Sequence, residues 1–240
     1  MQPPPKEAAW TRPDAFTARC LLRASRFGTL ATQSEGQPYA SLVTPAVLPD
    51  GSALILISAL ALHTRHLAQE PRCALMVMGE ATDPVNPQTA PRLTLSGRAE
   101  RLDDSDLRRF WVSRHPYAFY ADFTDFGLWR LTPQSGHFVA GFGRAHLLPA
   151  KTLLPPDSAI AAVAEAAPAL REALCGGNRP ALDRLTANHG LQGTWELLDM
   201  DVDGLDVIQD GLIARIHFDA PATTAAAAQA ALVRLTDAAP

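Results

Sequence analysis

The chain has 240 residues and a formal net charge of −4, so it has room for one large domain or two modest ones and no general attraction for nucleic acid or an anionic membrane. Hydrophobic residues make up 47% and charged residues 19%, which excludes a disordered chain and predicts a packed core. Three widely spaced cysteines exclude a disulfide framework and indicate reduced thiols. The N-terminal MQPPPKEAAW lacks the apolar core of a signal peptide, and no apolar stretch is long enough to span a bilayer. We therefore expect a cytoplasmic protein that binds neither nucleic acid nor membrane.

The first 150 residues consist mainly of strand patterns. Helical spacing of apolar residues occurs at 14–25, 63–70 and 103–114, and strand patterns occur at 28–33, 39–48, 53–58, 73–78, 92–101, 128–131 and 137–140. The sequence Pro49-Asp50-Gly51 is typical of a turn and predicts a hairpin between the second and third strands. Many short strands with few helices favour an antiparallel barrel over a doubly wound parallel sheet.

The composition changes near residue 150, where a proline-rich stretch at 150–156 predicts a linker. The patterns beyond it predict helices at 158–174, 181–189 and 223–238, and strands at 195–202, 207–208 and 212–218. We therefore predict an α+β fold class with two domains, a barrel at residues 1–150 and a smaller α+β domain at residues 151–240.

One segment has the chemistry of an anion site. The buried strand at 53–58 leads into a helix that begins with His63, Thr64 and Arg65. The first turn of a helix has free backbone N–H groups, and arginine can donate two parallel hydrogen bonds to a phosphate. An ordinary capped helix start at the surface is the alternative interpretation.

Residues 53–77, with YASLVTPAVLPDG before them and PRLTLSGRAERL after them, resemble the pyridoxamine 5′-phosphate oxidase-like superfamily. The resemblance covers roughly residues 15–148. It implies an antiparallel split β-barrel of the FMN-binding type, paired as a homodimer with the flavin at the dimer interface. Within the superfamily, GFGRA at 141–145, LTANHG, MDVDGLDVIQDG and ARIHFDAP resemble the haem-utilisation (HugZ-type) branch, which carries an accessory C-terminal domain.

The resemblance also implies roles for individual residues. The cofactor-binding residues that it implies are Ser41, Leu42, Val43 and Thr44 beside the flavin ring, Ser58, His63, Thr64 and Arg65 at the phosphate, and Arg92 from the second subunit. The oxidases carry an arginine and a lysine on the strand that matches Ser41 to Ala46, so this chain lacks two cationic ligands of the phosphate. We carry over no pyridoxamine phosphate oxidase activity and assign no catalytic residue.

Two histidines are candidates for a haem axial ligand, because in the haem-degrading relatives such a ligand lies late in the chain. They are His146, just after GFGRA, and His189; a structural role is the alternative for each. His63 and His66 have the spacing of two metal ligands on a helix, but no third ligand follows from the spacing, so we predict no metal site. The aromatic, acidic segment 115–127 is a candidate for lining a ligand pocket.

These observations favour an FMN-binding flavoprotein, an oxidoreductase with a small-molecule redox partner. Haem binding or haem degradation of the HugZ type is the first alternative. A non-enzymatic scaffold is the second, since the plant glutamyl-tRNA reductase-binding proteins have a similar layout. In each case a bound group, not a protein nucleophile, would supply the chemistry.

Overall fold

The computed structural model describes residues 8–141, 144–176 and 179–237. The chain forms two compact units, Met1–Leu154 and Pro155–Pro240, and each is described by itself. Within the described ranges, no helix has the length and the apolar character needed to cross a membrane.

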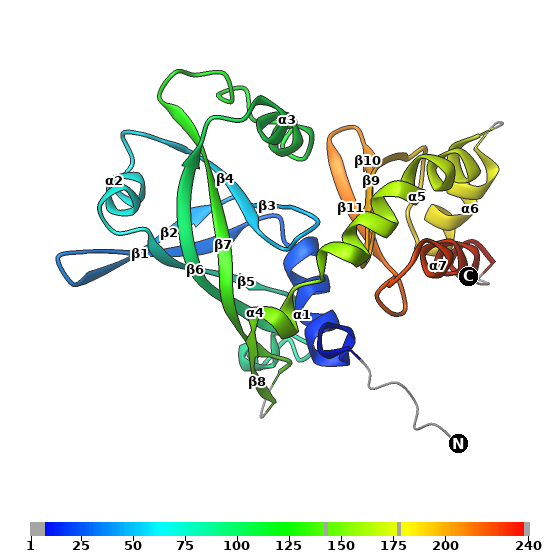
Figure 1. The fold of residues 1–240 in the computed structure, drawn as a ribbon, viewed down its shortest axis with the longest axis horizontal. Coiled ribbons are helices and arrows are strands. Elements are labelled where there is room, and N and C mark those ends of the chain that lie inside the picture. Colours follow the sequence, from blue (N-terminus) through cyan, green and yellow to red (C-terminus); the bar gives the residue numbers. More distant parts are fainter. Residues whose placement is uncertain (1–7, 142–143, 177–178, 238–240) are drawn as a thin grey trace. The chain divides into compact units, whose positions relative to one another are not determined.

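The first unit is built on one antiparallel sheet (Figure 1). Its strands are β1 (Gly28–Ser34), β2 (Gln37–Val43), β3 (Ala46–Val47), β4 (Ala53–Ser58), β5 (Arg72–Met78), β6 (Arg92–Leu102), β7 (Phe126–Val139) and β8 (Ala145–Pro149). The order is β2-β1-β5-β6-β7-β4-β3, with β8 paired to β7. The strands at the two ends, β2 and β3, are joined by only Thr44 and Pro45. Because the chain itself holds these ends together, the sheet curls into a barrel that stays split between them.

Strand β4 is buried on both of its faces, as its apolar sequence predicts. Ile55 and Ile57 belong to the core enclosed by the sheet. Leu54 and Leu56 pack on the opposite face in a second core with Trp111, which lies on α3 (Ser105–Ser113). Trp111 donates its indole N–H to the carbonyl of Thr44 at 3.0 Å, so α3 is also tied to the link between β2 and β3.

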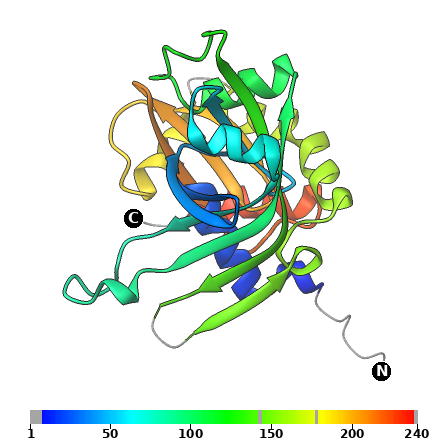
Figure 2. The same cartoon turned by 90° about the vertical axis from the view of Figure 1, so that its left-hand side faces the viewer.

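Helices α1 (Pro13–Ala24), α2 (Leu62–Gln69) and α4 (Ala150–Leu153) and the 3-10 turns η1 (Ala9–Thr11) and η2 (Pro87–Thr89) complete the first unit. Helix α2 packs against β1, and its Leu67 joins the enclosed core (Figure 2). The buried Arg19 of α1 donates to the carbonyls of Trp10 and Leu153 at 2.8 and 2.9 Å. This contact holds α4 against α1, where a linker was expected at 150–156.

The predicted hairpin between 39–48 and 53–58 forms across the Pro49-Asp50-Gly51 turn, but it is shorter than expected. Only Ala46 and Val47 pair with β4, while β2 pairs with β1 along its whole length. Glu35 and Gly36, with φ of 51° and 80°, supply the tight turn that joins β1 to β2. Pro45 has no N–H for a ladder, which explains why the strand breaks there.

The two strands predicted at 128–131 and 137–140 are one strand, β7. Its first part pairs with β4, its second part pairs with β8, and β6 runs along both. Pro133 is tolerated within it because the β6–β7 register shifts there, as at a β-bulge. A side chain at Gly97 would come within 2.1 Å of the Thr132 carbonyl, so glycine is required opposite the bulge.

The second unit has a three-stranded antiparallel sheet in the order β11-β10-β9. Its elements are α5 (Asp157–Cys175), α6 (Pro180–Asn188), β9 (Glu196–Asp201), β10 (Gly204–Gln209), β11 (Leu212–His217) and α7 (Ala225–Asp237). The helices pack together, with α5 against β9 (Figure 1). Arg215 on β11 is buried and pairs with Asp201 at 2.6 Å and Asp206 at 3.3 Å. These carboxylates raise the pKa of Arg215 against the opposing effect of its burial, so the MDVDGLD motif forms an internal ion network.

We expect Ile55→Ala to lower the free energy of unfolding by about 2–5 kcal/mol, because Ile55 is buried in a core that cannot fully close around the cavity. Urea unfolding followed by tryptophan fluorescence measures this change. Leu147→Ala, on the exposed face of β8, is the control and should change the value by less than about 0.5 kcal/mol. Equal effects of the two substitutions would contradict the description of β4 as a strand buried on both faces.

Candidate functional site

The turn between β4 and α2 is held by hydrogen bonds within the chain. The Ser58 hydroxyl donates to Asp125 Oδ2 at 2.6 Å and accepts from the Leu60 N–H at 3.1 Å. The Thr64 hydroxyl donates to the Ser58 carbonyl at 2.7 Å. The hydroxyls of Ser58 and Thr64, which the family resemblance assigns to a phosphate, thus donate their hydrogen bonds to other groups of the chain.

A pocket of about 400 Å³ opens beside this turn, and its lining includes Thr64, Arg65, Arg101, Asp125 and Trp129. Arg65 donates to the Leu60 carbonyl at 2.8 Å. A Cβ built on Gly127, which also lines the pocket, would lie 3.1 Å from Arg101 Nε and 3.6 Å from the Trp129 indole nitrogen. The absence of a side chain at this glycine therefore leaves room for both donors along one wall.

The pocket does not fit the phosphate of FMN as it stands. Its two guanidinium groups are accompanied by the carboxylate of Asp125, which would repel a phosphate dianion. His63, at the start of α2, adds no compensating charge, because burial and the neighbouring His66 lower its pKa. The arrangement combines cations and an anion in one pocket, which favours a ligand with less negative charge than a phosphate.

The other residues predicted to bind the flavin lie elsewhere in the subunit. Ser41, Leu42 and Val43 are on β2, an edge strand of the sheet, and Leu42 is 72% exposed. Thr44 follows β2 and accepts the Trp111 hydrogen bond. Arg92 begins β6 and donates to the Ala90 carbonyl at 3.2 Å. It lies nine residues before Arg101 on that strand, roughly 30 Å away. Within the chain, Arg92 is therefore separate from the pocket at α2.

A second pocket, of about 420 Å³, contains His146. Its lining combines an apolar wall with charged groups and consists of Pro13, Asp14, Thr17, Pro91, Phe138, Ala140, Arg144 and His146. His146 on β8 pairs across the sheet with the buried Phe138 of β7. Its Nδ1 atom lies 3.3 Å from Asp14 Oδ2 on α1. Two residues 132 positions apart in the sequence thus meet in this pocket.

The carboxylate of Asp14 is held in place. Arg12 donates to it at 3.1 and 2.7 Å, and the Ala15 N–H donates at 3.0 Å. A histidine whose Nδ1 faces a fixed carboxylate has Nε2 left to bind a metal, which is the arrangement found around most histidine ligands. These residues fit haem, because Phe138 offers an apolar wall and Arg144 a cation for a propionate. Phe142 and Gly143 of the GFGRA motif lie outside the described residues.

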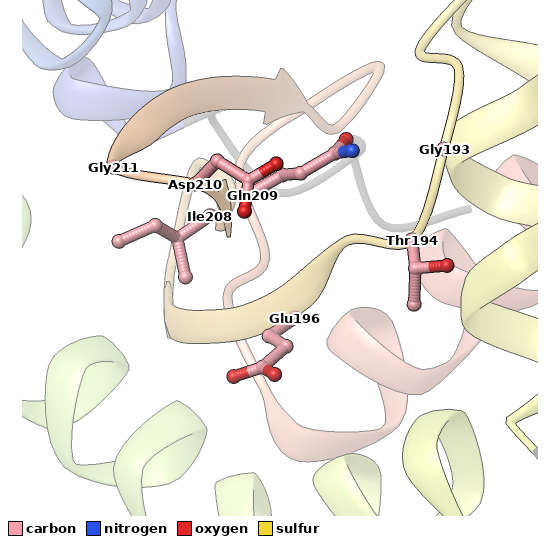
Figure 3. A pocket seen from close by; sticks show the side chains of 7 residues that line it. All are labelled: Gly193, Thr194, Glu196, Ile208, Gln209, Asp210 and Gly211. Atoms are coloured by element: carbon pink, nitrogen blue, oxygen red, sulfur yellow. The ribbon is translucent and has the colours of Figure 1, made fainter.

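His189, the other candidate ligand, belongs to the second unit. It caps the C-terminus of α6, and its Nδ1 donates to the Leu185 carbonyl at 2.8 Å. A pocket of about 510 Å³ in the same unit, between the residues before β9 and the β10–β11 turn, carries the carboxylates of Glu196 and Asp210 (Figure 3). Among the residues described in either unit, no three His, Cys, Asp or Glu side chains form a group that could hold a metal ion.

The aromatic segment 115–127 is partly structural. His115 stacks on Trp111 with ring centroids 3.9 Å apart and donates from Nδ1 to the Trp111 carbonyl at 2.8 Å. Tyr117, Phe119 and Phe123 are exposed. Asp125, near the end of the segment, lines the pocket at α2. The acidic character of this segment is visible in the sequence, but neither Asp125 nor Asp14 is marked by a motif as a residue of a pocket.

Residues 17–140, more than half of the chain, match the family described as pyridoxamine 5′-phosphate oxidase. The chain belongs to the pyridoxamine 5′-phosphate oxidase family. The predicted family is therefore confirmed, and so is the predicted fold class of a split barrel followed by a small α+β domain.

Two curated relatives are named as heme oxygenases. The chain is 37% identical over 135 residues to the chloroplastic heme oxygenase HOZ of Arabidopsis thaliana, a match that covers 54% of this chain and 41% of that protein. It is 31% identical over 125 residues to heme oxygenase HutZ of Vibrio cholerae, a match that covers 49% of this chain and 70% of HutZ. The chain thus spans less than half the length of HOZ. Together with the family match, these relatives confirm the predicted haem-utilisation branch.

Two solved structures match across both units. The protein Atu2129 of Agrobacterium tumefaciens, of unknown function, is 26% identical with a TM-score of 0.71, and the match covers 97% of this chain and 100% of that one. A heme binding protein from Mycobacterium smegmatis is 27% identical with a TM-score of 0.56, covering 94% and 97%. The relatives with a named ligand therefore favour the haem alternative over the flavoprotein that the sequence analysis placed first.

Acid should destabilise the first unit through His115. Burial lowers the pKa of His115 to about 4 in the folded protein, against an ordinary value of 6.5. The neutral ring therefore favours the folded state fully above pH 6.5, and this stability is lost as the pH falls toward 4. We expect the loss to reach about 3 kcal/mol, from the size of the pKa difference.

Urea unfolding between pH 7 and pH 4 measures this dependence. His115→Gln removes the titrating group and keeps a donor for the Trp111 carbonyl, so its stability should fall less steeply with acid than that of the wild type. His217 in the second unit also has its pKa lowered to about 4, mainly by burial, and it provides the same background in both proteins. Identical pH profiles would contradict the assignment to His115.

Proposed function

We propose that this protein binds haem and takes part in its oxidative degradation, with haem as the substrate. The observation that carries the proposal is the pairing of His146 with the fixed carboxylate of Asp14 in a pocket that has one apolar wall. The names of HOZ, HutZ and the mycobacterial heme binding protein support it. Bound haem would supply both the redox-active iron and the macrocycle that is oxidised.

The residues of the pocket have distinct parts in this proposal. His146 would hold the iron through Nε2. Asp14, whose Oδ2 lies 3.3 Å from His146 Nδ1, would orient the imidazole and make it a stronger ligand. Phe138 would exclude water from one side, and Arg144 would pair with a propionate. A fixed carboxylate behind the ligand favours the more positive state of the iron, so Asp14 would also adjust its reduction potential.

An FMN-dependent oxidoreductase with a small-molecule redox partner is the weaker proposal. The chain lacks the two strand cations, and the hydroxyls of Ser58 and Thr64 are donated within the turn. A scaffold without a cofactor would bind neither ligand, so the titrations below separate all three functions.

A homodimer is part of the proposal. Strand β2 is an edge of the sheet whose Tyr39 and Leu42 are exposed, and an exposed apolar edge favours pairing with another chain. A second copy would cover this edge. We also propose that the protein acts in the cytoplasm, where its cysteines would stay reduced.

We expect haemin added to the full-length protein to give a Soret band of bound haem. His146→Ala should weaken binding at least tenfold and change the spectrum. Asp14→Asn should weaken it by about 10–100-fold, because residues that orient a metal ligand have this effect on metal affinity. His137→Ala, an exposed residue of the adjoining strand, is the matched control and should bind as the wild type does.

The same samples, given a reductant and oxygen, test degradation through the decay of the Soret band and the appearance of linear tetrapyrrole absorption. Binding without decay would limit the function to haem binding. A wild-type spectrum without a Soret band would refute the proposal, and an unchanged spectrum in His146→Ala would refute the ligand.

Leu42→Glu should turn the dimer into a monomer, because it places a charge on the edge that a second copy would cover. Size-exclusion chromatography with light scattering measures the mass. Leu212→Glu, an exposed residue of the second unit, is the control and should leave a dimer intact. A monomeric wild-type protein would contradict the homodimer.

A further inference from the structure

We infer that Asp125 determines the ligand specificity of the pocket at α2 by excluding phosphate monoesters, FMN among them. Arg65, Arg101 and the first turn of α2 would attract an anion, as the sequence analysis expected. The carboxylate of Asp125 lies in the same pocket and serves as an internal anion. The protein thus keeps cationic groups at this turn, but the carboxylate of Asp125 supplies the negative charge that a bound phosphate would otherwise bring.

The position of Asp125 is set by the backbone and by its side chain. Its carbonyl accepts from the Ala59 N–H at 2.7 Å, next to the register in which Ser58 pairs with Phe126. Its carboxylate accepts the Ser58 hydroxyl at 2.6 Å. The backbone hydrogen bond fixes residue 125 at the end of β4, and the hydrogen bond from Ser58 holds its carboxylate at the turn.

Asp125 opposes a phosphate in two ways. Its charge offsets one of the two guanidinium groups of the pocket and so weakens the attraction of the pocket for a dianion. It also accepts the hydrogen bond of the Ser58 hydroxyl, which could otherwise donate to a phosphate oxygen. Substitution by asparagine separates these effects, because the amide oxygen can still accept from Ser58 while the charge is gone. Substitution by alanine removes the charge and releases the hydroxyl.

The test is a fluorescence titration of the full-length protein with FMN and, in parallel, with riboflavin, which has the same ring system and no phosphate. We expect FMN to bind the wild type no better than riboflavin does. Asp125→Asn should bind FMN at least tenfold more tightly than the wild type, Asp125→Ala should gain at least as much, and neither should gain affinity for riboflavin. Inorganic phosphate should compete with the new binding.

Two further variants control for charge and for the site. Asp122→Asn removes a negative charge from the same segment, at an exposed residue, and should gain nothing. Asp125→Asn combined with Arg65→Ala should lose the gain, because Arg65 is needed to hold the phosphate. Thermal unfolding verifies that each variant is folded. If Asp125→Asn does not fold, Asp125→Ala tests the inference in its place.

Several outcomes would overturn the inference. Wild-type protein that binds FMN much more tightly than riboflavin would show that Asp125 does not exclude phosphate. Folded Asp125 variants without a gain, or an equal gain in Asp122→Asn, would show the same. The inference does not depend on haem, since haemin titration of Asp125→Asn should match the wild type whether or not His146 is the ligand.

Discussion

Strand β7 is the element on which both candidate sites depend. It pairs with β6 along its length, with β4 through its first part and with β8 through its second part. Asp125 immediately precedes β7 and hydrogen-bonds Ser58 at the turn after β4. Near the other end of β7, Phe138 pairs with His146 on β8. A shift in the register of this strand would move Asp125 away from Ser58 and His146 away from Asp14. The bulge at Gly97 and Pro133 is therefore a constraint on function as well as on the sheet.

The two pockets differ in how their charges are balanced. At α2, the hydroxyls of Ser58 and Thr64 donate to other groups of the chain, and the carboxylate of Asp125 lies in the same pocket as two arginines. Around His146, the carboxylate of Asp14 has its own cation in Arg12 and still faces the imidazole. We propose that the first arrangement weakens the binding of a strongly charged anion and that the second prepares His146 to bind a metal. On this proposal, a few side chains change the ligand preference of the fold without any change of its strands.

Helix α3 and the segment after it tie the outer face of the barrel together. Trp111 contacts β4, hydrogen-bonds the link between β2 and β3, and stacks on His115. This contact accounts for the buried part of the segment 115–127, since His115 is buried against Trp111 while Tyr117 and Phe119 are exposed. Asp125 and Gly127, at the end of the segment, line the pocket at α2.

By itself, the sequence determined the kinds of elements and their order, since periodicity and turn residues such as Pro49-Asp50-Gly51 are local properties. Its motifs also identified the family and the haem-utilisation branch. Tertiary structure alone decided which strands pair, so that residues 39–43 joined β1 and not β4, and Pro133 stayed within a continuous strand. It alone brought Asp14 to His146 and Asp125 to Ser58, over separations of 132 and 67 residues. Contacts of this kind depend on the curl of the whole sheet, for which no pattern within a short window of sequence carries a signal.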